Sequence, residues 1–411
     1  MWWARRTTGG AGCDVAVSLE RKPVRRAAQA LVLCGLLAAS PGRANIGVPS
    51  TDPESFVLSA GGNLYVGNAT RIPGPVAANG TMLLDERVAV TAAVARRDLK
   101  LRLLASVEGD ALSVDGAAQL SNQARVKGSL TAERGVIVGV TARVDGDVVA
   151  TAGGVRIVRL ASVFGDVYAD GEFKGDRDVR VGSPGSRVEV RGDAIIRDRS
   201  EYFGAIAYEG ALSVLGTGLP VFHAGVVGLS PGTLAAPGMP AWKLSPLTVR
   251  SADPGPVDVT ISKESAVTTL PPGRYGVLAL GQEARLVLSA GVYDFEQVIA
   301  QSDARMRIEL PAAADTIELR VRRDLRPGRR VAMDLGTNDA ALRRDRAARV
   351  RTLVGGSFRG DQDVVWAGSI LAGKDIVLGK HTTLRGAAWS KGNLQMARDA
   401  VVEWVPLSAG D

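Results

Sequence analysis

A tetrapeptide pattern, Val-x-Gly-Asp/Ser, recurs in the first half of the chain, as Val107-Glu108-Gly109-Asp110, Val126-Lys127-Gly128-Ser129, Val144-Asp145-Gly146-Asp147 and Val163-Phe164-Gly165-Asp166. The four glycines are spaced by 19, 18 and 19 residues. Short runs between them alternate aliphatic and polar residues, as half-buried strands do. A period of this length is too short for a pair of helices. It suits one coil of a β-helix, made of three short strands joined by tight bends.

Each part of the pattern has a physical role in such a coil. Glycine supplies the positive φ or the close approach that a bend needs, and the Asp after it can hydrogen-bond to local backbone. Inward aliphatic side chains stack on their copies in the next coil, about 4.8 Å away. The alternative is an antiparallel sandwich, which has no reason to keep the same tetrapeptide in step. We therefore predict an all-β protein built as a parallel β-helix, in which one coil takes one period of the pattern.

Later glycines extend the pattern along the chain. The tetrapeptide recurs once more as Val190-Arg191-Gly192-Asp193, after a longer gap than the first four copies show. Such a gap is expected if one coil carries an extra loop. Two further pairs of glycines, Gly273 with Gly291 and Gly368 with Gly386, repeat the shorter of the two spacings. The predicted corner marks are therefore Gly109, Gly128, Gly146, Gly165, Gly192, Gly273, Gly291, Gly368 and Gly386.

The first 44 residues have the features of a signal peptide. Arg25 and Arg26 precede an apolar run over 27–39, and Gly42-Arg43-Ala44 resembles a cleavage site. The run is too short to cross a bilayer, which takes roughly 20 apolar residues. We expect an exported protein of the periplasm, cell surface or extracellular space, with no transmembrane span once the leader is removed.

The remaining chain divides by composition. Residues 45–222 form the first predicted β-helix module, and 257–411 form the second. Between them, residues 223–256 are rich in Pro and Gly and indicate a linker or an extended crossover. A short polar helix or exposed loop is expected over 340–349.

Composition excludes several classes of function. The sequence holds two Cys and two His, and both Cys13 and Cys34 lie in the leader, which argues against a Cys/His zinc site and a disulfide scaffold. The leader contributes +5 of the net charge of +7 and leaves +2 from Asn45 onward. The basic balance is therefore no argument for nucleic acid. We predict no cofactor and no nucleic-acid partner.

Two stretches resemble known β-helical proteins. The Val-x-Gly-Asp coils of 107–193 resemble bactofilins, bacterial proteins that polymerise through a β-helix. Residues 270–405 resemble a recurrent exported β-helical module, with a P-G-x-Y segment at 272–275 and an A-G-x-Y-x-F segment at 290–295. A late G-S-I-L-A-G-K-D-I coil follows at 368–376. The resemblance implies a right-handed β-helix. Bactofilins are typically short and cytoplasmic, whereas this chain has a leader and a second module.

Two charged clusters are candidates for binding sites. The first is a group of acidic residues at one predicted bend: Asp170, Glu172, Asp176 and Asp178. Their carboxylates could bind calcium, or could act as the catalytic acids of a carbohydrate-active β-helix enzyme. The second is a basic stretch that could hold an anionic polymer: Arg320, Arg322, Arg323, Arg326, Arg329 and Arg330. The alternative for both is a solvated surface, since Lys174 and Arg177 lie among the acids and alternation along a strand exposes half of a basic run.

No catalytic constellation is assembled by the sequence. Gly228-Leu229-Ser230-Pro231-Gly232 matches a nucleophile elbow in letters, but Pro231 lacks the N–H that would serve as an oxyanion donor. We therefore predict a non-catalytic exported structural or adhesive protein, whose partners are further copies of itself or cell-surface polysaccharide. A polysaccharide lyase or hydrolase and a bactofilin-like filament remain the alternatives.

Overall fold

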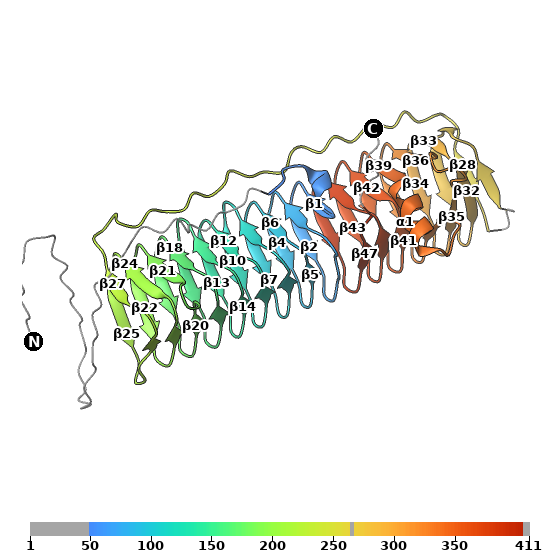
Figure 1. Ribbon diagram of the computed structural model, residues 1–411. Coiled ribbons are helices and arrows are strands. Elements are labelled where there is room, and N and C mark those ends of the chain that lie inside the picture. The colour runs from blue at the N-terminus through green and yellow to red at the C-terminus, as the bar shows by residue number, and fades with distance from the viewer. Residues whose placement is uncertain (1–48, 264–266, 406–411) are drawn as a thin grey trace, which may run out of the picture.

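The computed structural model describes residues 49–263 and 267–405, which form a long β-solenoid (Figure 1). Each coil contributes short strands to three faces, here called faces A, B and C. Neighbouring strands on each face are parallel and come from successive coils. The prediction of an all-β parallel β-helix is confirmed.

Face A is a sixteen-stranded sheet. In spatial order it contains β27 (Val226–Gly228), β24 (Ala205–Tyr208), β21 (Arg187–Val190), β18 (Val167–Ala169), β15 (Val148–Ala150), β12 (Leu130–Ala132), β9 (Ala111–Ser113), β6 (Ala93–Ala95), β3 (Val76–Ala78), β1 (Leu58–Ala60), β45 (Ala388–Ser390), β42 (Ser369–Ala372), β39 (Val350–Val354), β36 (Ile317–Val321), β33 (Gly291–Phe295) and β30 (Gly273–Arg274).

Face B is a second sixteen-stranded sheet. In the same direction it contains β25 (Leu212–Leu215), β22 (Ala194–Arg197), β19 (Phe173–Gly175), β16 (Gly154–Ile157), β13 (Gly135–Val138), β10 (Ala117–Leu120), β7 (Leu99–Leu101), β4 (Met82–Leu84), β2 (Leu64–Val66), β46 (Leu394–Met396), β43 (Ile376–Leu378), β40 (Phe358–Arg359), β37 (Leu325–Pro327), β34 (Gln297–Ala300), β31 (Val277–Leu280) and β28 (Val259–Ile261).

Face C consists of an eight-stranded and a seven-stranded sheet, which Arg71 joins by pairing with both Ala89 and Val401. The first contains β26 (Val221–Phe222), β23 (Glu201–Tyr202), β20 (Arg180–Val181), β17 (Ser162–Val163), β14 (Arg143–Val144), β11 (Arg125–Val126), β8 (Ser106–Val107) and β5 (Ala89–Val90). The second contains β47 (Val401–Glu403), β44 (Thr383–Arg385), β41 (Val365–Ala367), β38 (Ala332–Asp334), β35 (Arg305–Glu309), β32 (Arg285–Ser289) and β29 (Thr268–Leu270).

The core is a set of aliphatic columns that run along the solenoid axis. Leu120 pairs with Val138 and Val138 with Ile157 in the strand register, and all three side chains are fully buried. Burying one such side chain stabilises the fold by roughly 1.5–3 kcal/mol. Because each coil buries its inner face only against its neighbours, the stack as a whole carries the stability.

The first coil of the described residues lies in the middle of the rod. Strand β1 pairs with β3 on one side and with β45 on the other, with Leu58 opposite Ala388. Strand β2 likewise lies between β4 and β46. We call this contact between the first and last coils of the chain the seam. Across it, the two stretches of coils share faces A and B (Figure 1).

Residues 229–258 connect the two outer ends of the rod, and we call them the strap. They contain no helix or strand and run along the outside of the coils (Figure 1, yellow-green). Sixteen coils at about 4.8 Å each span roughly 75 Å. Thirty residues of Pro-rich extended chain reach roughly 90 Å. The strap is therefore long enough only because it stays extended.

The strap packs on the outer surface of face A. Trp242 and Leu244 lie in a cluster with Phe56, Val94 and Leu112, and all five are buried. Farther along, Leu247 and Val249 pack against a second cluster, formed by Leu353, Leu371, Ala387 and Trp389. The apolar outer surface of face A is thus covered by residues of the same chain.

Two short helical segments lie outside the regular coils. A 3-10 turn, η1 (Pro53–Ser55), precedes β1. The α-helix of the described residues, α1 (Ala340–Ala348), lies between β38 and β39, where the sequence predicts a short polar helix or an exposed loop. Asp339 caps it by accepting a hydrogen bond from the Leu342 N–H at 2.8 Å.

Candidate functional site

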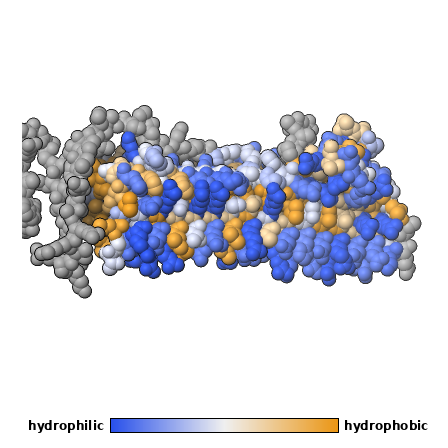
Figure 2. Space-filling view, turned by 60° about the horizontal axis from the view of Figure 1, so that its bottom comes forward, coloured by the Kyte–Doolittle hydropathy of each residue, from blue (hydrophilic) through white to orange (hydrophobic). Residues whose placement is uncertain are grey.

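The last coil before the strap, residues 210–228, carries no Asp, Glu, Lys or Arg, and we call it the end coil. It contains β25, β26 and β27. The absence of charge continues along the strap as far as Trp242. Several aliphatic side chains of the end coil are exposed: Val214 (43%), Leu215 (47%), Leu219 (79%), Val221 (47%) and Val227 (39%). In Figure 2, apolar surface gathers at this end of the rod, on the left.

The end coil is also an open sheet edge. Strands β25, β26 and β27 are each the last of their sheet, so one side of each strand has no partner strand among the described residues. Natural proteins usually protect such edges with charged side chains or proline. Here the only proline between β25 and β27 is Pro220. Unpaired backbone groups and exposed aliphatic side chains therefore lie together.

The opposite end of the rod differs from the end coil because it carries charged side chains. It is formed by β28, β29 and β30, and it exposes Val257 (61%) and Val267 (55%). Charged groups lie there too. Lys263 forms an ion pair with Glu283 at 2.9 Å, and Asp258 accepts a hydrogen bond from the Val277 N–H at 2.7 Å. The two ends of the rod are therefore not equivalent.

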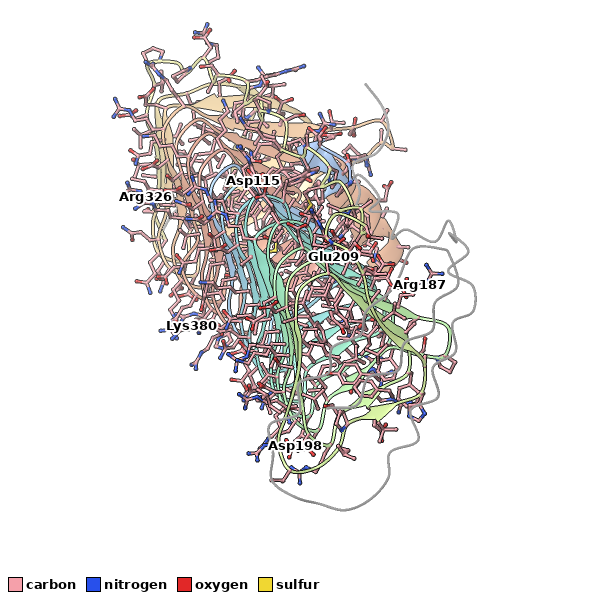
Figure 3. All side chains as sticks on the ribbon, turned by 90° about the vertical axis from the view of Figure 1, so that its left-hand side faces the viewer. Asp115, Arg187, Asp198, Glu209, Arg326 and Lys380 are labelled. Atoms are coloured by element: carbon pink, nitrogen blue, oxygen red, sulfur yellow. The ribbon has the colours of Figure 1, made fainter. Side chains whose placement is uncertain are left out.

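Along the sides of the rod, many charged side chains form ion pairs between neighbouring coils. Arg125 contacts Asp145 in the next coil at 2.7 Å, and Arg385 contacts Glu403 at 3.0 Å. Figure 3 looks along the rod and shows charged side chains such as Arg326 and Lys380 pointing outward from its rim. An exposed pair contributes roughly 0–1 kcal/mol to stability.

The structure does not bring the four candidate calcium ligands together. Asp170 and Glu172 precede β19, whereas Asp176 and Asp178 follow it, so the two pairs lie at opposite ends of one strand. Three of the acids form ion pairs with arginines of neighbouring coils: Asp170 with Arg191, Asp176 with Arg156 and Arg197, and Asp178 with Arg199. Across residues 49–263 and 267–405, no group of acidic, His or Cys side chains could hold a metal ion.

The six candidate anion-binding arginines are spread around the rod. Arg320 lies on face A and Arg326 on face B, and the others lie at the corners on either side of face B. Each has a carboxylate partner: Arg320 with Glu318 (2.7 Å), Arg322 and Arg323 with Glu296 (3.4 and 2.7 Å), Arg326 with Asp324 (2.8 Å), Arg329 with Asp363 (3.6 Å), and Arg330 with Asp303 (2.6 Å). The six arginines therefore do not form a single patch, and each of them is already paired with a carboxylate.

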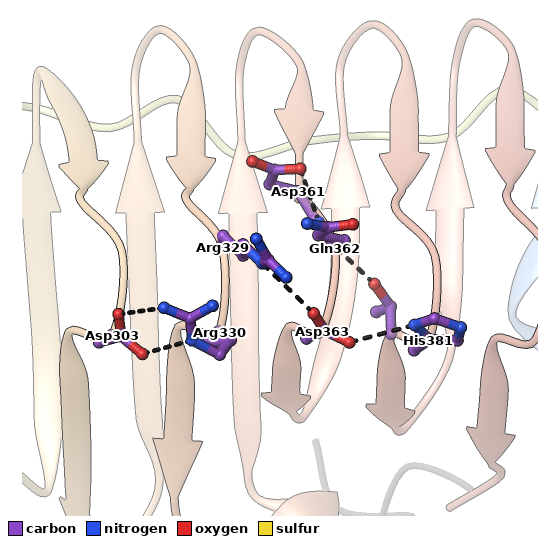
Figure 4. A network of polar contacts seen from close by, with 8 residues as sticks. Asp303, Arg329, Arg330, Asp361, Gln362, Asp363 and His381 are labelled. Atoms are coloured by element: carbon purple, nitrogen blue, oxygen red, sulfur yellow. Dashed lines mark hydrogen bonds and ion pairs between the residues drawn. The ribbon is translucent and has the colours of Figure 1, made fainter.

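Part of this network runs along the corner between faces B and C (Figure 4). Two hydrogen bonds, of 2.6 and 2.7 Å, join Arg330 to Asp303, and this arginine holds the pKa of the Asp303 carboxyl below its usual range. One coil further, Asp363 lies between Arg329 and His381, 3.1 Å from the His381 Nδ1. His381 thus belongs to a row of polar contacts along this corner that links neighbouring coils.

The predicted glycine marks fall into two groups. Gly109, Gly128, Gly146 and Gly165 lie at the corner between faces C and A, where a Cβ would meet the preceding coil at short distances. These four are needed for close approach, since none has a positive φ. A second group at the start of face A strands has positive φ: Gly291 (136°), Gly368 (90°) and Gly386 (154°).

Two of the marks do not occupy the predicted position. Val163 pairs with Val181, so the register places Ser183 opposite Gly165 and Gly182 opposite Phe164, whereas Gly192 lies at the corner between faces A and B. The extra residues 183–186 displace the pattern at this point. Gly273 pairs with Tyr293 rather than with Gly291, because that coil is longer than the repeat of the first half of the chain.

Sequence reasoning missed a stacked ladder on face C. Arg143 lies over the ring of Phe164 at 4.4 Å, and Arg180 lies over Phe203 at 4.4 Å. The Phe203 ring in turn stacks on His223 at 4.3 Å, with the ring planes 11° apart. The unequal coil lengths hide this ladder from a fixed-period search. It ends at His223, on the end coil.

Comparisons with known proteins leave the family open. No family model and no curated protein matches the sequence. Among solved structures, the crystal structure of an ice-binding protein from an Antarctic bacterium, Flavobacteriaceae, is similar at 11% identity over 86% of this chain and 98% of that one, with a TM-score of 0.25. A likeness of that size carries no argument, so the fold rests on the strand register and the bactofilin resemblance stays a prediction. Within the described ranges, no helix has both the length and the apolar character of a membrane span.

Proposed function

We propose that this protein is a non-catalytic structural or adhesive rod that associates through its end coil. The observation that carries the proposal is the coincidence of three properties in residues 210–228. The coil has open strand edges, it exposes aliphatic side chains, and it has no formal charge at neutral pH.

Association at this edge is favourable for two reasons. A strand added to β25, β26 or β27 would satisfy the outer backbone N–H and C=O groups of that strand. It would also bury side chains such as Leu219, each contributing roughly 1.5–3 kcal/mol when fully buried. Since the coil carries no charge, no ionised group has to be stripped of water when the edge is covered.

The use of acidic residues supports a non-catalytic role. Glycoside hydrolysis needs two carboxyl groups at a fixed separation across a cleft. In this chain Asp170, Asp176 and Asp178 are engaged by arginines of neighbouring coils on the sides of the rod. They act as lateral staples between coils.

Export remains part of the proposal. The residues that carry the predicted signal peptide, 1–44, lie outside the described residues, as do Cys13 and Cys34. A chain whose described part contains no thiol suits an oxidising compartment, because it needs no disulfide machinery there.

A bactofilin-like filament is the second candidate. The observation that favours it is the parallel course of faces A and B from β27 and β25 at one end to β30 and β28 at the other. A second copy stacked head to tail would continue both faces without changing strand direction. The difference between the two ends sets a single polarity for such a polymer.

The test compares two double variants of the exported chain. Val214→Lys with Leu219→Lys places charge on the end coil. Ile137→Lys with Leu160→Lys places the same charge on similarly exposed positions of the rod's sides. Sedimentation velocity over a concentration series is expected to show association of the unmodified chain and of the side variant, and monomers for the end-coil variant. Monomers of the unmodified chain at every concentration would overturn the proposal, as would undiminished association of the end-coil variant.

A further inference from the structure

We infer that a cleft where the strap crosses the seam binds a carboxylate-bearing sugar unit. The cleft has a volume of about 310 Å³, near the lower bound for small-ligand sites. Three separate stretches line it: the first coils with Ser59 and Asn79, the strap with Lys243 to Leu247, and the last coil with Ser390 and Lys391. The site deepens the adhesive part of the proposed function, but it does not depend on assembly through the end coil.

The cleft lies where the alternation of inward and outward side chains along the strap shifts by one residue. Trp242 and Leu244 point toward face A, and Lys243 and Ser245 are exposed. After Pro246 the inward residues become Leu247 and Val249, one position out of step. The cleft lies at this change, directly over the β1/β45 pair, where Ser245 and Pro246 form part of its wall.

Hydrogen bonds hold the walls of the cleft in place. The Asn79 Oδ1 accepts a hydrogen bond from the Leu244 N–H at 2.8 Å, and its Nδ2 donates to the Leu244 carbonyl at 3.4 Å. The Ser245 N–H donates to the Thr51 carbonyl at 2.8 Å. The site is therefore preformed on rigid elements, which limits the entropy lost on binding.

One hydroxyl side chain, Ser59, lines the cleft. Ser59 is 2% exposed and lines the cleft from the outer surface of β1, where its register neighbours are the apolar Ala77 and Trp389. Its hydroxyl makes no hydrogen bond to any residue of the described ranges. A ligand with hydroxyl or carboxylate oxygens in the cleft would accept a hydrogen bond from this hydroxyl.

Two lysines line the same cleft as Ser59. Lys243 comes from the strap and Lys391 from the turn between β45 and β46, and both line the cleft. Within the described part of the chain neither has a carboxylate within ion-pairing distance. Pro53, Leu244 and Leu247 add an apolar wall. Cationic groups, a hydroxyl and an apolar wall together match the carboxylate, hydroxyls and C–H face of a uronic acid.

The test titrates the full chain with glucuronic acid, glucose, acetate and inorganic phosphate, with binding followed by NMR chemical shifts. We expect glucuronate to bind at least tenfold more tightly than each of the other three. Lys243→Ala with Lys391→Ala should weaken glucuronate at least tenfold, and Ser59→Ala several-fold. Lys100→Ala is the matched control, because Lys100 is an exposed lysine on face B, away from the cleft.

Three results would overturn the inference: equal affinity for glucose, affinity for acetate or phosphate as high as for glucuronate, or full binding by the double lysine variant. The end-coil variant Val214→Lys with Leu219→Lys is expected to bind glucuronate like the unmodified chain. The experiments therefore distinguish a failure of the proposed binding of glucuronate in the cleft from a failure of the proposed assembly through the end coil.

Discussion

At the scale of single residues, the solenoid uses two kinds of corner. The corner between faces B and C carries one left-handed non-glycine residue in nearly every coil, including Thr141 (φ 55°) and Leu160 (φ 63°). Such a conformation costs an ordinary L-residue roughly 1–2 kcal/mol. Backbone hydrogen bonds between coils offset this cost, as where the Thr141 N–H donates to the Arg159 carbonyl at 3.3 Å. The corner between faces C and A instead needs glycine for space.

The close approach at that second corner predicts a large effect of one methyl group. A Cβ at Gly146 would lie 2.7 Å from the backbone carbonyl of Gly128 in the preceding coil. Gly146→Ala should therefore lower the free energy of unfolding by about 1–3 kcal/mol, measured by urea denaturation.

The matched control for this prediction is Gly225→Ala. A Cβ at Gly225 meets nothing within 4 Å, so the substitution should be neutral or stabilise by up to about 1 kcal/mol, through the lower entropy of the unfolded chain. Equal effects of the two substitutions would show that contact between coils at the corner is not what selects glycine.

Corner chemistry is the part that could be predicted from the sequence. The spacing of Gly109, Gly128, Gly146 and Gly165 is enough to place one corner per coil, because those coils have no insertions. The prediction for Gly192 is wrong in position, since the residues inserted after Gly182 shift the pattern to another corner. A local signature cannot distinguish corners that share the same residue types.

At the scale of elements, the strap is a packed part of the molecule. Trp242 is buried, its ring meets the Phe56 ring edge-on at 6.5 Å, and its Nε1 donates to the Ser50 carbonyl at 2.9 Å. The Pro and Gly content of this stretch indicates an extended chain. Its packing could not be predicted, because the phase change at Pro246 interrupts the alternation that would reveal a buried side.

Anchoring by Trp242 predicts a local effect of its removal. Trp242→Ala deletes a side chain of the kind that typically contributes about 3 kcal/mol in a core. The strap should then detach more often while the coils stay folded, so limited proteolysis within 229–250 should accelerate at least tenfold. Thr248→Ala, at an exposed strap position, should leave the cleavage rate unchanged. A Trp242→Ala chain cleaved no faster than the unmodified chain would mean that other contacts hold the strap.

At the scale of the whole molecule, the order of coils in space differs from their order in the chain. The last coil of the sequence stacks on the first through β1/β45 and β2/β46, and the strap closes the path from one end of the rod to the other. The sequence could not predict this seam. Aliphatic columns continue across it as they do between any two coils, so no residue pattern marks which coils will meet.

The seam decides where the ends of the rod lie, and therefore which coil is exposed for assembly. Tyr65 and Gln395 are register partners across it on the outer surface of face B. Their Cα atoms are expected about 4.8 Å apart, within the 4.4–6.8 Å that a disulfide spans. The most direct measurement is the yield of that crosslink in a Tyr65→Cys, Gln395→Cys chain whose Cys13 and Cys34 are replaced by Ser.

The seam predicts nearly complete intramolecular crosslinking of monomers under mild oxidation. After cleavage of the strap, the two fragments should stay joined on a non-reducing gel. A Lys100→Cys, Gln395→Cys chain is the control, because Lys100 lies two coils beyond Tyr65 in the same sheet and cannot reach. Absence of the Tyr65–Gln395 crosslink, or an equal yield in the control, would contradict a solenoid that is continuous across the seam.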